Sequence, residues 1–443
     1  MSMKKCRMVR LIASGSAPGV NPWMILPFAV LLLSIALGPL FLERWWHHHY
    51  PKVAVGLGLI TAGYYVFFLR DGGALLHVAH EYVSFIALIG SLFVVAGGIH
   101  ITVKGESKPF FNVLFLFTAA VMANLVGTTG ASMLLIRPWI RMNRYRITAF
   151  HVVFFIFVVS NVGGALTPIG DPPLFLGYLK GVPFFWVLQH CWIPWLLTVI
   201  LLLGVFYLLD RNNFRKPPAA VTEAMTHSET WRFEGLPNLL FLAVIIGAVL
   251  ANTILPPLVP DALMIAAAVA SFFTTPRPIH ESNAFSFAPI KEVAWLFVGI
   301  FVTMLPALDY LEKNSALLGL TSPTQYYWAT GSLSAFLDNA PTYLTFLAAA
   351  MGEQGLSVNA PEQVRQFVIE APRYLAAISL GAVFFGACTY IGNGPNFMVK
   401  NIAHQLGVQT PGFFGYLLRY AVPILIPIYA LIAVLFFSRW RIF

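Results

Sequence analysis

The sequence is poor in charge and in cysteine, and it lacks a phosphate-binding loop. Only 10% of its 443 residues are charged, whereas soluble domains carry about 25% charged residues. With a mean hydropathy of +0.76, this composition excludes a soluble globular protein. The cysteines Cys6, Cys191 and Cys388 lie too far apart for a metal-ligand motif or a disulfide framework, so we expect free thiols. The absence of a Gly-x-x-x-x-Gly-Lys-Ser/Thr motif argues against ATP-driven transport by this chain alone.

Long apolar runs take the place of charged surface. A helix needs about 20 largely apolar residues to cross a bilayer, and roughly ten stretches meet this need, including residues 22–42, 183–209, 237–254 and 412–437. The runs are continuous, whereas strands of a transmembrane barrel alternate in polarity. We therefore expect an all-α polytopic membrane protein. Its net charge of +9 lies in short clusters between the runs, which favours loops that orient the protein in the bilayer over a nucleic-acid surface.

The apolar segments occur twice in the same order, on either side of a polar interval at residues 210–236. Each half contains three helices, an interrupted segment that we interpret as a re-entrant hairpin, a broken helix and a final helix. We expect a first repeat at 22–209, with a hairpin at about 111–136 and a broken helix at about 147–180. The second repeat would span 237–437, with a hairpin at about 324–350 and a broken helix at about 373–406. Tails at 1–21 and 438–443 would flank the two repeats. Because each re-entrant hairpin returns to its own side, the second repeat would be inverted. The basic residues of the loops then fall mostly on one side of the membrane, although those of both tails fall on the other.

Polar residues and helix breakers mark both hairpin tips and both broken helices. The hairpins turn at Gly127 to Ser132 and at Asp338 to Thr342, and the breaks lie at Ser160 to Pro173 and at Thr389 to Asn396. The residues that prevent a continuous helix are Gly163, Gly164, Pro168, Gly392, Gly394 and Pro395. Backbone groups freed at membrane depth are tolerated only where they are buried in protein or line a cavity, so we expect these segments to meet at one centre. Ordinary polar loops, and kinks used only for packing, are the alternatives.

Two acidic residues, Asp171 and Asp338, lie inside these interruptions, whereas most other acidic residues fall in loops or near segment ends. Ionisable groups at membrane depth are costly and usually functional, and a carboxylate there can bind a proton and a cation in turn. Na⁺ prefers oxygen ligands such as carboxylates, amides, hydroxyls and carbonyls. Asp338 could instead be the N-cap of a helix, and Asp171 a loop residue at the membrane edge. Lys400, one turn after Asn396, could bind an anion or a carboxylate, or anchor the chain at the inner surface.

At these four segments the sequence resembles the ion transporter superfamily, which includes NhaD-type sodium/proton antiporters, arsenite permeases, citrate transporters and divalent anion/sodium symporters. The motifs that carry the resemblance are Ser160-Asn161-Val162-Gly163-Gly164, Thr167-Pro168-Ile169-Gly170-Asp171 and Asp338-Asn339-Ala340-Pro341. The resemblance implies a site in a mobile transport domain that moves as an elevator against a dimeric scaffold. It also implies the residues that line the site, which are Thr128, Thr129, Ser132, Asn161, Thr167, Asp171, Asp338, Asn339, Thr342, Asn393 and Asn396. The sequence departs from the family in two ways, because Pro172-Pro173 follow Asp171 and neither tip carries the Ser-Asn-Thr motif of dicarboxylate symporters.

The sequence thus predicts a secondary transporter of the bacterial inner membrane, with a sodium/proton antiporter as the leading hypothesis, and no enzyme. Na⁺ and H⁺ would alternate at Asp171 and Asp338, with Asn161 and Asn393 completing a Na⁺ site, and no cofactor is expected. The alternative is a carrier of citrate or another small organic anion, bound by helix N-termini, the asparagines of the second break and Lys400. An intramembrane aspartyl protease is disfavoured by the duplicated hairpins and breaks. The expected partners are the lipid bilayer, the transported species and a second copy in a homodimer, but no nucleic acid.

Overall fold

The computed structural model describes residues 20–102, 108–214 and 232–438. Most of the predicted N-terminal tail with Cys6, the middle of the predicted 210–236 loop and the end of the C-terminal tail lie outside the described residues. Within the described ranges, seven helices are long and apolar enough to cross a membrane, or up to eight if a pair bent by 101° counts as one span. This confirms the predicted class, an all-α polytopic membrane protein.

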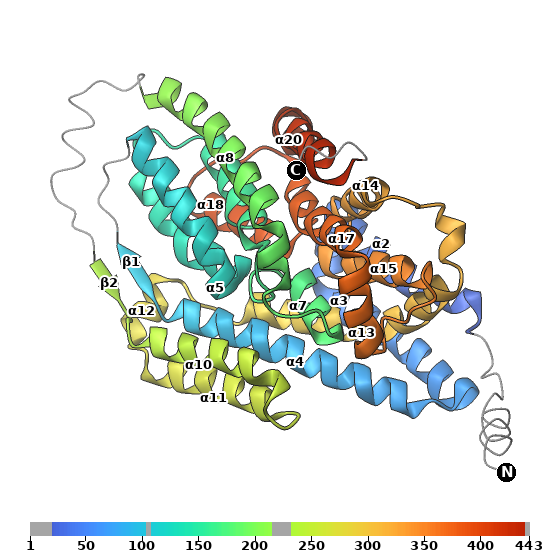
Figure 1. Cartoon of the computed structure of the whole chain (residues 1–443). Coiled ribbons are helices and arrows are strands. Elements are labelled where there is room, and N and C mark those ends of the chain that lie inside the picture. Colours follow the sequence, from blue (N-terminus) through green and yellow to red (C-terminus); the bar gives the residue numbers. More distant parts are fainter. Residues whose placement is uncertain (1–19, 103–107, 215–231, 439–443) are drawn as a thin grey trace, which may run out of the picture.

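Six helices, three from each half of the chain, pack together in what we call the α4 group. They are α2 (Leu26–Phe41), α3 (Glu43–Gly63), α4 (Gly72–Gly97), α10 (Asn238–Leu250), α11 (Val259–Thr274) and α13 (Ala288–Lys313). Figure 1 shows α10 and α11 lying along α4. The outer faces of these helices expose large apolar side chains such as Leu59, Leu240 and Phe273, which fits contact with lipid.

A second set of helices, the α5 group, contains all four interrupted segments. It comprises α5 (Pro109–Met142), α6 (Ala149–Val158), α7 (Pro172–Lys180), α8 (Trp186–Phe214), α14 (Pro323–Ser334), α15 (Asn339–Gly352), α17 (Pro372–Phe385), α18 (Gly394–Gln405) and α20 (Ile426–Ile432). The two groups meet where α4 contacts α5 and α7, and where α13 contacts α15. Short α7 therefore lies at the boundary between the groups (Figure 1).

Shorter elements connect or extend these helices. They are η1 (Pro22–Ile25), η2 (Tyr64–Leu69), η3 (Val162–Gly164), η4 (Ala251–Thr253), α12 (Arg277–Ser282), η5 (Ser315–Leu318), α16 (Pro361–Glu370), η6 (Gly386–Cys388), α19 (Phe413–Tyr416), η7 (Leu417–Leu425) and η8 (Ala433–Phe437). Strands β1 (His100–Thr102) and β2 (Arg232–Glu234) pair antiparallel. This ribbon was not predicted, because three residues on either side of a long polar interval carry no local strand signal. Cys191 and Cys388 are free and buried, as expected.

The element α5 consists of two helical arms that fold back on each other. Gly127 between them has φ +76° and ψ 155°, a conformation that glycine adopts without steric cost. The rings of Phe115 and Trp139, equally far from Gly127 in the sequence, stack with their centroids 5.4 Å apart. At the open end, the side chains of Asn112 and Asn143 exchange hydrogen bonds of 2.8 and 3.2 Å.

The helices α14 and α15 form a second hairpin around Asp338. The ring of Tyr326 on α14 packs against the ring of Phe346 on α15, with centroids 6.5 Å apart. Both interrupted segments are therefore helical hairpins in space. Their re-entry into the membrane and the inversion of the two halves stay predictions.

A buried charged network closes the open end of the first hairpin. Asp210, at the end of α8, is 0% exposed and pairs with the guanidinium of Arg146. Its carboxylate also accepts a hydrogen bond of 2.8 Å from Asn112 Nδ2 and lies 3.0 Å from His151 Nε2. The helix α8 continues to Phe214, so the predicted loop at 210–236 begins too early. The helix can continue because the partners of Asp210 allow this acidic residue to be buried.

Replacing this carboxylate should destabilise the whole α5 group. The variant Asp210→Ala removes the charge that Arg146, His151 and Asn112 contact, and losing one partner of a buried ion pair lowers the free energy of unfolding by about 3–5 kcal/mol. Thermal unfolding of the purified protein in detergent measures this loss. The control Glu370→Ala removes an exposed acid that accepts a hydrogen bond from Gln366 and should change stability by less than about 0.5 kcal/mol. Equal effects of the two variants would contradict the assignment.

Candidate ion-binding site

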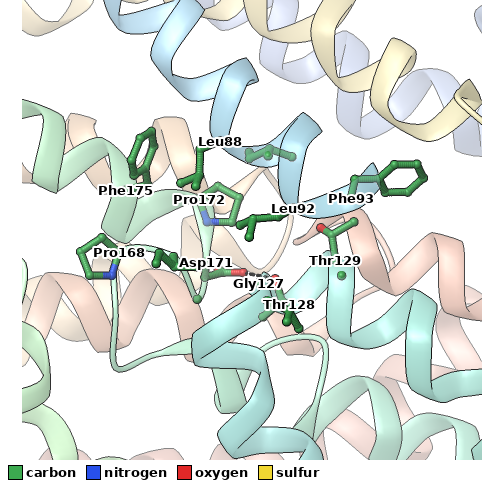
Figure 2. Close-up of a pocket in the computed structure, with 15 residues that line it drawn as sticks. Leu88, Leu92, Phe93, Gly127, Thr128, Thr129, Pro168, Asp171, Pro172 and Phe175 are labelled. Carbon is green, nitrogen blue, oxygen red and sulfur yellow. Dashed lines mark hydrogen bonds between the residues drawn. The ribbon is translucent and has the colours of Figure 1, made fainter. Parts of the chain in front are cut away.

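The two hairpin tips and the second broken helix converge on the carboxylate of Asp171, which is 1% exposed. Its Oδ1 atom accepts hydrogen bonds from Thr128 Oγ1 at 2.7 Å and from Asn393 Nδ2 at 2.9 Å. Its Oδ2 atom accepts a hydrogen bond of 2.6 Å from Asn339 Nδ2. Figure 2 shows Asp171 and Thr128 pointing toward each other. Each of the other three interruptions therefore supplies one neutral donor to this carboxylate.

Asp171 and Asn393 occupy matching places in the two broken helices. Each is an extended residue directly before a half-helix, with φ and ψ of −144° and 144° at Asp171 and of −153° and 139° at Asn393. The half-helices α7 and α18 then begin with a proline in their first two positions, where the missing N–H costs nothing. Neither side chain caps its own helix, which leaves both available to the site.

The predicted helix breakers divide into two kinds. Gly163, Gly164, Pro168 and Gly392 lie between the half-helices. Gly394 and Pro395 are instead the first residues of α18, because proline fits the first turn of a helix and interrupts only its interior. The second break therefore comprises the residues between Cys388 and Gly394.

The charge balance around Asp171 favours a cation or a proton. Helices α7, α15 and α18 all begin at the site, and the partial positive charge of their N-termini stabilises the carboxylate in part. Within the part of the chain that the structure describes, no Lys, Arg or His lies within ion-pair distance of Asp171. Burying a carboxylate costs several kcal/mol unless a partner charge compensates. The site can lower this cost by binding a positive ion.

Two buried amide oxygens, Asn161 Oδ1 and Asn339 Oδ1, have no hydrogen-bond partner among the described residues. Asn339 lies at the carboxylate, to which its Nδ2 atom donates. Asn161 donates its amide group to Asn396 Oδ1 at 2.7 Å and to the Ile156 carbonyl at 2.8 Å. The two asparagines approach each other at Gly386, where an added Cβ would lie 3.0 Å from Asn161 Oδ1 and 3.4 Å from Asn339 Nδ2. Buried polar atoms are normally paired, so these two acceptor oxygens leave room for a hydrogen-bond donor, a water molecule or a cation.

The remaining predicted residues have local partners. Ser132 and Ser160 share a hydrogen bond of 2.7 Å between their hydroxyls. Thr167 donates to the Asn124 carbonyl at 2.6 Å, and Thr342 to the Asp338 carbonyl at 2.8 Å. Asn396 donates to the backbone carbonyls of Gly386 and Thr389 at 2.8 and 2.9 Å and so holds the second break together. Thr129 lines the cavity beside Asp171 (Figure 2).

Asp338 and Lys400 do not contact Asp171 directly. Asp338 is the N-cap of α15, and its Oδ1 atom accepts a hydrogen bond of 3.0 Å from the Ala340 amide. This is the helix-cap alternative considered for it, and it places Asn339 at the first position of α15. The Lys400 ammonium lies over the rings of Tyr390 and Phe397, 4.7 and 5.7 Å from their centroids. Such cation–π contacts stabilise the lysine where it lies.

A small cavity of about 20 Å³ adjoins Asp171, enough for roughly one water molecule or one dehydrated monatomic ion. The first hairpin tip, the first break and α4 surround it, and Leu88, Leu92 and Phe93 of α4 form its apolar wall (Figure 2). Sequence reasoning missed this wall, because an apolar face of a long helix carries no signal that it borders a site.

Asn124 is a further residue that the sequence analysis did not identify. Its Nδ2 atom donates to the Gly163 carbonyl at 2.7 Å, and its Oδ1 atom accepts from the Leu166 amide at 2.9 Å. It therefore satisfies backbone groups of the first break from the hairpin arm. A buried asparagine three residues before the hairpin glycine could have indicated this role.

Comparison with known proteins gives a match over nearly the whole chain. A family model described as "Putative citrate transport" matches residues 17–437, which include both hairpins and both breaks. The chain is also similar to a "46 kDa membrane protein" of Mycobacterium leprae (strain TN), with 22% identity over 351 residues that cover 76% of this chain and 80% of that protein. The family match confirms the resemblance to the ion transporter group.

The close backbone packing of the first break should not tolerate a side chain at Gly170. A Cβ on Gly170 would overlap the Gly164 carbonyl oxygen, and the Gly170 carbonyl already accepts the Thr128 amide at 2.7 Å. Gly170→Ala should lower the free energy of unfolding by about 1–3 kcal/mol. In Gly247→Ala the added Cβ meets nothing within 4 Å, so this matched variant should be as stable as the wild type or slightly more stable, since alanine favours helix. Thermal unfolding of both variants measures these changes in stability. A Gly170→Ala protein as stable as the wild type would contradict the close packing of Gly170 against Gly164.

Proposed function

The chain belongs to the citrate transport family that it matches, and we propose that it is a secondary transporter that exchanges Na⁺ for H⁺ at Asp171. One observation carries this proposal, a buried carboxylate with three neutral donors and no basic side chain at ion-pair distance in the described residues. A carboxylate in this setting is most stable when protonated or bound to a cation. A second copy of the chain and a bacterial inner membrane belong to the same proposal.

The proposed Na⁺ ligands are oxygens already at the site. The Asp171 carboxylate provides charge, and the unpartnered oxygens of Asn161 and Asn339 provide neutral ligands. Na⁺ is a hard cation that prefers such ligands. The cavity of about 20 Å³ beside Asp171 is lined by Thr128 and Thr129 and not by Asn161 or Asn339, so it offers space for an ion next to the carboxylate but apart from these two amide oxygens. Asn393 donates a hydrogen bond from its Nδ2 atom to Asp171 Oδ1 and so holds the carboxylate in position.

Exchange follows from competition for the same oxygen atoms. A proton on Asp171 removes the negative charge that a cation needs, and a bound cation occupies the oxygen that a proton needs. Release to either side requires the cavity wall formed by α4 to separate from the hairpin tip. We therefore extend the proposal to a movement of the α5 group against the α4 group, as in the elevator that the family resemblance implies.

A citrate carrier is the second candidate, favoured by the description of the family that the chain matches. In this reading Asp171 would bind a coupling ion, and helix N-termini at the site would bind carboxylates. The asparagines of the second break are engaged with Asp171 and with backbone carbonyls, and Lys400 faces aromatic rings. Citrate binding would therefore require these side chains to rearrange. A protease dyad has no support, because the hydrogen bonds described for the two carboxylates join neither to the other.

Transport in proteoliposomes separates the two candidates. Purified protein with a trapped pH dye should release protons from the lumen when Na⁺ or Li⁺ is added outside, and Asp171→Asn should abolish this response. Asp171→Asn keeps the size of the side chain but removes the charge that holds the cation. If cations give no signal while labelled citrate accumulates, the antiporter proposal fails and the carrier reading replaces it.

The role of Asp338 has its own test in the same assay. Serine is also a good N-cap, so Asp338→Ser should keep α15 and Asn339 in place and retain exchange. Asp338→Ala should cost about 1 kcal/mol of stability through loss of the cap. If Asp338→Ser folds normally but does not exchange, Asp338 carries charge during transport, as the sequence first suggested.

A further inference from the structure

A second buried charged site lies at the far end of α7 from Asp171. Lys180, the last residue of this nine-residue helix, is 3% exposed, and Glu81 of α4 is 4% exposed. The Lys180 ammonium lies 2.9 Å from Glu81 Oε1 and donates a hydrogen bond of 3.0 Å to Asn359 Oδ1. One short helix therefore carries the proposed ion site at its start and a buried ion pair at its end.

The contact between α4 and α7 is otherwise apolar. The rings of Phe85 and Phe175 have centroids 6.5 Å apart, and Leu88 faces the Asp171 cavity two turns after Glu81. The order of these contacts shows that α4 and α7 run antiparallel side by side. Apolar side chains of packed helices interdigitate, and a buried ion pair adds a directional contact that forms only in the register where its two charged groups meet. The ion pair thus sets the position of α7 along α4.

Other charged groups near this pair have partners of their own. Asp309 of α13 accepts the Tyr65 hydroxyl at 3.0 Å, and Glu312 accepts the Val358 amide at 2.7 Å. His77, one turn before Glu81 on α4, places Nε2 3.2 Å from Glu81 Oε1 with its side chain 55% exposed. Water therefore reaches the edge of this interface while the ion pair itself stays buried.

We propose that Glu81 and Lys180 form an ionic lock between the two helix groups, which holds α7 against α4 and keeps the Asp171 cavity closed on that side. Opening the cavity separates Leu88 and Leu92 from the hairpin tip, and this movement breaks or shifts the pair. Glu81 and Lys180 are positioning residues that act on Asp171 through α7. The lock itself does not depend on the proposed function; only its expected effect on Na⁺/H⁺ exchange rests on that proposal.

The lock is tested by the accessibility of the cavity wall, with no substrate needed. In a chain whose native cysteines are replaced, the reporter Leu88→Cys is reacted with a water-soluble maleimide in proteoliposomes. The double variant Glu81→Gln/Lys180→Met removes both charges at similar volume, so no single charge is left buried. Its labelling rate should rise by about fivefold or more, the lower range of measured conformational couplings. The charge-exchanged variant Glu81→Lys/Lys180→Glu should return the rate toward that of the parent.

Two further variants make the result decisive. Ser84→Ala is the matched control, because Ser84 lies on α4 one turn after Glu81 but bonds Asp261 of α11 at 3.0 Å, inside the α4 group, and its labelling rate should equal the parent rate. Asn359→Ala removes only the hydrogen bond to Lys180, so it should fold and raise labelling by at least about twofold. The lock is overturned if the double variant and Asn359→Ala are labelled at the same rate as the parent. It is also overturned if the labelling rate of Ser84→Ala rises as much as that of the double variant. Failure of Na⁺/H⁺ exchange with an altered labelling rate would overturn the proposed function and leave the lock in place.

Discussion

The carboxylate of Asp171 is buried, and both of its oxygen atoms accept hydrogen bonds from segments far apart in the sequence. Thr128, Asn339 and Asn393 each donate one hydrogen bond, from two hairpin tips and the second helix break. A neutral donor stabilises a carboxylate but does not cancel its charge. The remaining imbalance is what a proton or a cation can relieve, and the proposed exchange depends on it.

The same requirement explains the irregular backbone around the site. A continuous helix would consume the backbone groups and point Asp171 and Asn393 along its side, whereas breaks place them at the start of half-helices. The freed backbone groups then need partners at a depth without water. Asn124, Asn396 and the close packing of Gly164 with Gly170 meet that need, so these residues support the site without touching an ion.

The α4 group contributes the boundary of the site. Leu88 and Leu92 close the cavity with apolar surface, which strengthens electrostatic interactions on the other side of the wall by excluding water. The buried pair of Glu81 and Lys180 crosses the same boundary and fixes its register. Asp171 at the start of α7 and Lys180 at its end therefore belong to one interface with α4.

Hydrophobic patterning alone determined the class of this protein, because the length of an apolar run reports directly on membrane spanning. The glycines, prolines and polar residues inside those runs also located the two hairpins and the two breaks, since these residues act on the backbone locally. Tertiary structure decided which side chains from distant segments meet: it gave Asp171 its donors and buried Asp210 and Lys180 in ion pairs. Those outcomes depend on contacts between residues up to 222 positions apart, and a local pattern carries no information about a partner at such a distance.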